Sequence, residues 1–164
     1  MTLKYTLKFF DYWHLSSGLS AGAKLDSTVV KDENTLPYAS GKTIKGLVRE
    51  MAEEFGDISA MHKAYFSNAT LEENLKDEIV SNDLQDNLYD VIASTKIGDD
   101  GLAVDNSLRE IEVVIPLTLY GEIRDIPDGF EETLKKSLKL IKRMGLNRNR
   151  GLGRCEFCVI EESK

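Results

Sequence analysis

The 164 residues include 28 Asp and Glu against 21 Lys and Arg, for a formal net charge of −7, and 41% of them are hydrophobic. This length suits one domain, residues 1–164, with a sizeable core, and the sequence lacks the run of ~18 apolar residues that a membrane helix needs. Lys4 and Lys8 interrupt the apolar residues of the N-terminal segment, so this segment predicts a strand and not a signal peptide. We therefore expect a cytoplasmic protein without a membrane partner.

The first half of the chain predicts one strand and one helix. Apolar and polar residues alternate over 3–10, which is typical of a strand. After a loop of small residues at 16–24, apolar residues recur at helical spacing from Ile44 to Phe55, with Ser40 as the expected N-cap. We expect residues 56–86 to hold a loop and a short acidic helix.

The second half predicts three strands and a second helix. Alternation favours a core strand over 89–95 and another over 111–119, where Pro116 implies an edge position or a bulge. Helical spacing from Phe130 to Met144 predicts a helix that ends at Gly145, and alternation from Cys155 predicts a last strand. The order β-α-β-β-α-β predicts an α+β, ferredoxin-like fold with both helices on one face of the sheet.

The spacing of the cysteines and histidines does not favour a redox or metal site. Cys155 and Cys158 form a CxxC, but residues three apart in a strand face opposite sides, so the thiols should diverge. We interpret them as two partly buried cysteines and not as a redox or zinc pair. His14 and His62 are the only histidines, and neither has a Cys or His cluster around it. We expect no histidine metal site.

The charge is unevenly distributed. Residues 135–154 contain eight Lys and Arg and no acid, whereas residues 71–90 contain seven acids and one lysine. A second basic segment, "GKTIKGLVR" at 41–49, also lacks acids. Two basic segments on an acidic protein indicate a surface that binds a polyanion.

The segment "GLNRNRGLGR" at 145–154 combines glycines with arginines. Glycines allow positive φ and a close backbone approach to a ligand, and arginines make charge-assisted, often bidentate phosphate contacts. The alternative is a helix C-cap glycine followed by a solvated basic turn. The residues concerned are Gly145, Gly151 and Gly153 with Arg148, Arg150 and Arg154.

The "GKT" at 41–43 invites a nucleotide-binding interpretation. A P-loop needs the pattern G-x-x-x-x-G-K-[ST], but Leu36 occupies the place of its first glycine. We therefore expect no ATP binding there. The start of a helix with free N–H groups beside Lys42 is an anion site in its own right.

Two of these segments resemble a known family. "LPYASGKTIKGLVRE" and "GLNRNRGLGRCEF" resemble the helix-start segment and the C-terminal glycine-rich loop of the RAMP superfamily, the RNA-binding proteins of CRISPR effector complexes. "LDSTVVKD" resembles the segment before the helix, and "STKIGDDGLAVDNSLREIEVVIP" the middle of the backbone subunits. The resemblance implies an RRM-related ferredoxin-like fold. It also implies a subunit that grips CRISPR RNA by its backbone and stacks beside similar subunits and copies of itself, most like the repeated backbone subunit of type III complexes.

The resemblance also implies site residues. In that family an aspartate before the helix cuts target RNA with a divalent cation such as Mg²⁺, and Asp26 stands at the matching place. Asp26 could instead stabilise a turn, as Asp32 could. Residues 96–108 are the candidate for the hairpin that splays nucleotides. The expected RNA-binding residues are Lys42, Lys45, Arg49, Arg148, Arg150, Gly151, Gly153 and Arg154.

Two alternatives remain open. The chain could be a non-catalytic assembly subunit of such a complex. It could also be a stand-alone RNA-processing endoribonuclease of the same superfamily, which would use a histidine or tyrosine near the RNA, here His14 or Tyr38.

Overall fold

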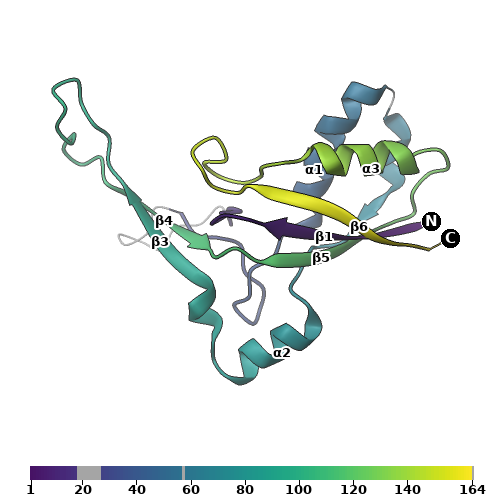
Figure 1. Ribbon diagram of the computed structural model, residues 1–164, viewed down its shortest axis with the longest axis horizontal. Helices are drawn as coiled ribbons and strands as arrows, with labels where there is room; N and C mark the ends of the chain where they lie inside the picture. The colour runs from purple at the N-terminus through teal and green to yellow at the C-terminus, as the bar shows by residue number, and fades with distance from the viewer. Residues whose placement is uncertain (18–26, 57, 164) are drawn as a thin grey trace.

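The computed structural model describes residues 1–17, 27–56 and 58–163 (Figure 1). Its strands and helices follow one another as β1 (Thr2–Phe9), α1 (Gly41–Ala52), β2 (Tyr65–Phe66), α2 (Glu73–Ser81), β3 (Tyr89–Ser94), β4 (Arg109–Val114), β5 (Thr118–Arg124), α3 (Glu131–Leu140) and β6 (Cys155–Ser163). Short 3₁₀ segments lie at η1 (Glu53–Phe55), η2 (Ser59–Lys63) and η3 (Gln85–Leu88).

The main sheet has four antiparallel strands in the order β2-β5-β1-β6. Helix α1 connects β1 to β2 across β5, and α3 connects β5 to β6 across β1. Both helices lie on one side of the sheet, whereas α2 lies on the other (Figure 1). These two interleaved β-α-β units confirm the α+β, ferredoxin-like fold that the sequence predicts.

The core lies between the sheet and the two crossover helices. On β1, the alternating residues Leu3, Tyr5, Leu7 and Phe9 are all at most 2% exposed. The facing sides of the helices are equally apolar, because residues at helical spacing point the same way. The buried hydrophobic residues of the two helices are Ile44, Val48 and Ala52 of α1 and Leu134 and Leu138 of α3.

The strand predicted over 89–95 exists, but the prediction that it lies in the core is wrong. It forms β3, but β3 pairs only with β4 in a separate two-stranded sheet, and this hairpin projects from the main sheet (Figure 1). Val91 is 48% exposed, and the hairpin tip exposes Ile97, Leu102 and Leu108. The second strand of the ferredoxin-like unit is instead the two-residue β2, inside the segment whose pattern gave no strand.

The predicted strand over 111–119 is two strands. β4 ends at Val114 and β5 begins at Thr118, and Pro116, which has no N–H to donate, lies in the break. The chain therefore leaves the hairpin and enters the main sheet at this proline.

The second helix is shorter than predicted. It ends at Leu140, and Ile141 has an extended backbone with ψ of 106°, so Gly145 is not its C-cap. Beyond the helix, the amide of Met144 donates to the carbonyl of Gly153 over 3.0 Å. Tertiary pairing with the glycine-rich segment thus replaces the last helical turn.

Glu112 of β4 fixes the base of the hairpin. Its carboxylate accepts hydrogen bonds from the Lys31 ammonium, over 2.6 Å, and from the Val29 amide, over 3.1 Å. The Lys31 ammonium also lies 4.6 Å from the ring centroid of Tyr89, whose hydroxyl donates to the carbonyl of Thr35 over 2.6 Å. Burial, followed by the negative charges of Glu112 and other nearby carboxylates, raises the pKa of Tyr89. The hairpin base is therefore tied to residues 29–35.

The two cysteines point apart, as predicted. Cys155 is buried and Cys158 is exposed, so the expectation that both are partly buried is wrong. Burial raises the pKa of the Cys155 thiol to about 12, although the nearby Lys142 ammonium opposes this shift, so the buried thiol is inert at neutral pH. None of the helices in the described part of the chain has the length and apolar character needed to span a bilayer.

Candidate nucleic-acid interface

The start of α1 is held by side chains. The Ser40 hydroxyl accepts from the Lys42 amide over 3.2 Å, which confirms the predicted N-cap, and the Gly41 amide donates to Asn68 Oδ1 over 3.0 Å. A Cβ on Gly41 would lie 2.1 Å from the carbonyl oxygen of Phe66. Gly41 therefore serves the packing of α1 on β2, and the expectation of free N–H groups is wrong for Gly41 and Lys42.

A hollow joins the two basic segments of the sequence. On one side lies the start of α1, with Ser40, Lys42 and Thr43, and on the other lie Gly145 and Leu146 of the glycine-rich segment. Residues 15–17, Val30 and Tyr38 complete its wall. Lys42 is exposed and supplies the positive charge of this hollow. The fold thus brings residues 42 and 145, a hundred positions apart, to one site.

The three glycines of residues 145–154 have different roles. All have positive φ, at 93° for Gly145, 90° for Gly151 and 74° for Gly153. A Cβ would lie 2.3 Å from the His14 carbonyl oxygen at Gly145 and 2.0 Å from the Met144 carbonyl oxygen at Gly153, but would meet nothing within 4 Å at Gly151. The first and last glycines serve packing, and only Gly151 faces open space.

The arginines of this segment also differ. Arg148 and Arg150 are exposed, and no described acid lies within ion-pair distance of either. Arg154, in contrast, places Nε 3.2 Å from Asp11 Oδ2, and its guanidinium lies 5.2 Å from the ring centroid of Phe10. Two free guanidinium groups at the loop tip and one held at its stem could all meet an anionic polymer.

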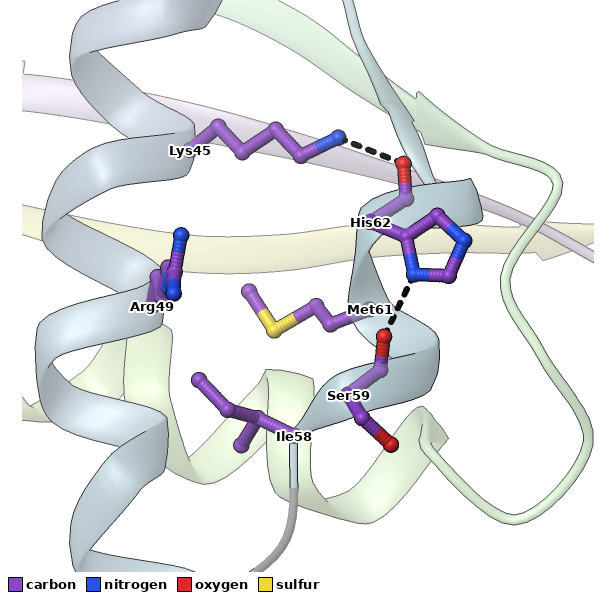
Figure 2. A pocket seen from close by; sticks show the side chains of 6 residues that line it. All are labelled: Lys45, Arg49, Ile58, Ser59, Met61 and His62. Carbon is purple, nitrogen blue, oxygen red and sulfur yellow. Dashed lines mark hydrogen bonds between the residues drawn. The ribbon is translucent and has the colours of Figure 1, made fainter.

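Lys45 and Arg49 line a different hollow, between α1 and η2 (Figure 2). The Lys45 ammonium donates to the carbonyls of His62, over 3.0 Å, and Ala64, over 2.7 Å. Arg49 lies seven residues beyond Lys42, about 10 Å along the helix, with Nε 3.8 Å from the Glu53 carboxylate. The fold therefore separates Lys45 and Arg49 from the Lys42 hollow, and Lys45 already binds two backbone carbonyls.

Asp26 lies outside the described residues, so its position is untested. The chain is fixed on both sides of its segment: the Ser17 amide donates to the Thr28 carbonyl over 3.1 Å, and the Glu112 amide donates to the Ser27 carbonyl over 3.1 Å. Ser17 also borders the Lys42 hollow. The residues that flank Asp26 therefore connect to both this hollow and the hairpin.

His14 is a buried link that the sequence pattern does not identify. Its side chain is fully buried, and Nδ1 lies 2.5 Å from the carbonyl oxygen of Glu112, which can only accept. Nδ1 therefore donates, and in the neutral ring Nε2 accepts from the Ser27 hydroxyl, 3.1 Å away. With both nitrogens engaged, His14 holds the chain beside Asp26 and has no free nitrogen for a substrate.

The described residues contain no group of three or more His, Cys, Asp or Glu side chains that could hold a metal ion. Mg²⁺, however, often takes only one or two carboxylates and completes its shell with water and substrate phosphates. One aspartate beside an RNA phosphate would fit that pattern, and Asp26 is the residue that the sequence offers for it.

Comparison with known proteins identifies the family of this protein. The sequence model of the RAMP superfamily matches residues 6–156. The chain therefore belongs to the RAMP superfamily. A comparison with curated proteins finds no match.

Solved structures that share the fold include two of the Type III-B Cmr-beta. One is a chain of the cryo-EM structure of the Type III-B Cmr-beta bound to cognate target RNA, with a TM-score of 0.70, 11% identity and coverage of 97% of both chains. The other is a chain of the Type III-B Cmr-beta apo state, with a TM-score of 0.71, 11% identity and coverage of 99% of this chain and 98% of that one. The likeness extends over nearly the whole length of both chains.

Proposed function

We propose that this chain is a guide-RNA-binding backbone subunit of a type III-like CRISPR effector complex. In this function, copies stack side by side along a CRISPR RNA and cut the paired target RNA through Asp26 with a divalent cation. The proposal is supported by membership of the RAMP superfamily over residues 6–156 and by the likeness to chains from two structures of the Type III-B Cmr-beta, one of which is the structure bound to cognate target RNA.

The observation that carries the proposal is the hollow where Lys42 meets the glycine-rich segment. A guide RNA varies in sequence, so a protein that holds every guide must bind its phosphates and sugars and not its base edges. Lysine, arginine and open backbone at a glycine are the groups that do this. Lys42 lies in this hollow beside Gly145 and Leu146, and the exposed Arg148 and Arg150 and the open side of Gly151 follow in the same glycine-rich segment.

Cleavage by Asp26 is the second part of the proposal. A 2′-OH that attacks the adjacent phosphate must be activated and held in line with the leaving oxygen. A carboxylate beside that phosphate can orient the hydroxyl or hold a cation that neutralises the developing charge. Support comes from the family resemblance of "LDSTVVKD" and from the hydrogen bonds that fix Ser17 and Ser27 on either side of the segment.

The alternatives differ in assembly and in chemistry. A non-catalytic assembly subunit would bind guide RNA without cutting target RNA. A stand-alone endoribonuclease would act as a monomer on repeat RNA, and the hydrogen bonds of both His14 nitrogens argue against His14, one of its two candidate residues. Tyr38, on the wall of the Lys42 hollow, is the other.

The experiment is purification of the full chain with and without a CRISPR array in the same cell. Light scattering on a sizing column gives the mass, and sequencing identifies any bound RNA. We expect a multimer that carries guide RNA of mixed sequence. A monomer without RNA contradicts the proposal, and a monomer that cuts repeat RNA supports the stand-alone nuclease instead.

A further inference from the structure

A second basic hollow lies at the stem of the glycine-rich segment, beyond the RNA-binding residues already proposed. It is lined by Phe10, Lys142, Arg143, Arg154, Cys155 and Glu156. Three cationic side chains thus face one carboxylate, in a protein whose net charge is −7. Of these residues, only Arg154 belongs to the sequence-predicted set.

Both guanidinium groups of this hollow are held in place by other parts of the protein. Arg143 Nη1 donates to the Arg148 carbonyl over 3.1 Å, and Arg154 Nε lies 3.2 Å from Asp11 Oδ2. Each guanidinium has five N–H donors, so one bond to the protein leaves donors for a ligand. A guanidinium held at one edge also loses less side-chain freedom when it binds a phosphate.

The ring of Phe10 adds an aromatic surface to this charge. It is 38% exposed, and it lies 5.2 Å from both the Lys8 ammonium and the Arg154 guanidinium. An exposed aromatic ring among cations is the combination that binds single-stranded nucleic acid, because a base can stack on the ring while its phosphates meet the charges.

We infer that this hollow is a nucleotide subsite for single-stranded RNA, with phosphates on Lys142, Arg143 and Arg154 and a base against Phe10. The inference rests on the proposed function. Arg143 contacts the glycine-rich segment through the Arg148 carbonyl, and Gly145 and Leu146 of the same segment line the Lys42 hollow. One RNA strand that crosses this segment therefore reaches both hollows.

The charge test compares two double variants of the full chain. Lys142→Gln with Arg143→Gln removes two charges from the hollow but keeps at position 143 an amide that can donate a hydrogen bond, as Arg143 does to the Arg148 carbonyl. Lys136→Gln with Arg124→Gln removes two charges elsewhere. Binding of short unstructured RNAs of unrelated sequence is measured against salt concentration. We expect the log–log salt slope to shrink by about 1.4 for the first variant, from roughly 0.7 per phosphate contact, and to stay near wild type for the second.

The aromatic test uses Phe10→Leu and Phe10→Tyr. We expect the leucine variant to bind RNA about tenfold more weakly, because a stacked base is lost, while the tyrosine variant binds like the wild type. Equal affinity of all three proteins overturns the stacking part of the inference.

The outcomes separate this inference from the proposed function. If wild-type protein binds no RNA, the proposed function fails. If it binds RNA and the two double variants share the wild-type slope, only the subsite is wrong. If Lys142→Gln with Arg143→Gln loses self-association but keeps RNA affinity, the hollow is a protein interface and the inference is overturned. Thermal melting of each variant verifies that it is folded.

Discussion

A Cβ atom on Gly145 would lie 2.3 Å from the carbonyl oxygen of His14. The same oxygen accepts a hydrogen bond from the Leu146 amide over 2.9 Å. The glycine-rich segment is therefore seated directly on the backbone that follows β1. Its first glycine is required by packing, whatever the segment binds.

Gly145→Ala and Gly151→Ala form a matched pair, because φ is 93° and 90° at the two positions. We expect Gly151→Ala to cost about 1–2 kcal/mol of unfolding free energy, the usual cost of positive φ for an L residue. Gly145→Ala should cost about 1–3 kcal/mol more, since its Cβ also overlaps backbone. Denaturant unfolding measures both. Equal losses would show that the segment can move away from His14.

Lys42 and Lys45 should have separable roles. Lys45→Met removes two hydrogen bonds from an ammonium to backbone carbonyls, and we expect a stability loss of about 1–3 kcal/mol. Lys42→Met should leave stability nearly unchanged and reduce the salt slope of RNA binding by about 0.7. Thermal melting and RNA titration are run on both variants. If Lys45→Met reduces RNA binding while stability is unchanged, Lys45 binds RNA directly, as the sequence pattern predicts.

Asp26→Asn tests the proposed chemistry. A carboxylate beside phosphates repels them unless a cation intervenes, so assembly and RNA affinity should persist or rise slightly while target cleavage is lost. EDTA should stop cleavage by the wild type as well. Cleavage of a labelled target RNA by the guide-loaded complex is the measurement.

Asp32→Asn is the control for this substitution. Asp32 Oδ1 accepts from the amides of Asn34 and Leu36, each over 2.9 Å, and an asparagine oxygen can accept the same bonds. The control should therefore cut at the wild-type rate. Cleavage that persists without the Asp26 carboxylate, or a wild-type complex that never cuts, would make this chain a scaffold.

Mg-ATP should not bind at residues 41–43. The Gly41 and Lys42 amides are taken by Asn68 and Ser40, and Gly41 lies against the Phe66 carbonyl. Calorimetric titration with Mg-ATP should give no heat, and Lys42→Ala should weaken binding of RNA alone. Saturable heat at micromolar ATP contradicts this expectation.

Stability should fall at alkaline pH. Burial raises the pKa of Tyr5, of Tyr89 and of Cys155, so the folded state keeps protons that the unfolded chain releases above about pH 8.5 for cysteine and about pH 10 for tyrosine. Since the unfolded state then binds fewer protons, stability decreases as pH rises above these values. Denaturant midpoints from pH 7 to pH 11 measure this dependence.

Tyr5→Phe isolates one contribution. Within the described part of the chain, no group bonds to the buried Tyr5 hydroxyl, which lies against Gly121. Loss of an unsatisfied buried hydroxyl should leave stability equal or higher at pH 7 and should flatten its decline above pH 10. An unchanged alkaline decline would show that Tyr5 ionises equally in both states.

The sequence predicts the elements whose residues pack on one side only. β1, α1 and β6 have clear alternation or helical spacing, and all three are where the pattern puts them. β2 has two residues, too few for any period, so nothing in the sequence marks it. The alternation over 89–95 does not correspond to burial, because in β3 Val91 and Ala93 are exposed and only Tyr89 and Ile92 are partly buried. Only the sheet pairing distinguishes a projecting hairpin from a core strand.

The sequence names residues of a candidate site but does not show how they are arranged. Glycine can be required by a ligand or by a neighbouring backbone, and the contacts at Gly145 and Gly153 are visible only in three dimensions. The same holds for Lys45, whose partners lie 17 and 19 residues later. Phe10 gave no signal, and Arg143 was only one of the eight cations counted in residues 135–154, because the residues that share their hollow come from separate parts of the chain.

Glu112 anchors the base of the β3–β4 hairpin to the rest of the protein. Its amide, carbonyl and carboxylate bond to Ser27, His14 and Lys31. Any rotation of the hairpin about its base would strain the bonds to these three residues. Movement of the hairpin is therefore coupled to Ser27, the residue after position 26. Among the hydrogen bonds described, those of the hairpin tip stay within the tip. Insertions or deletions in the tip would therefore leave the bonds of Glu112 intact.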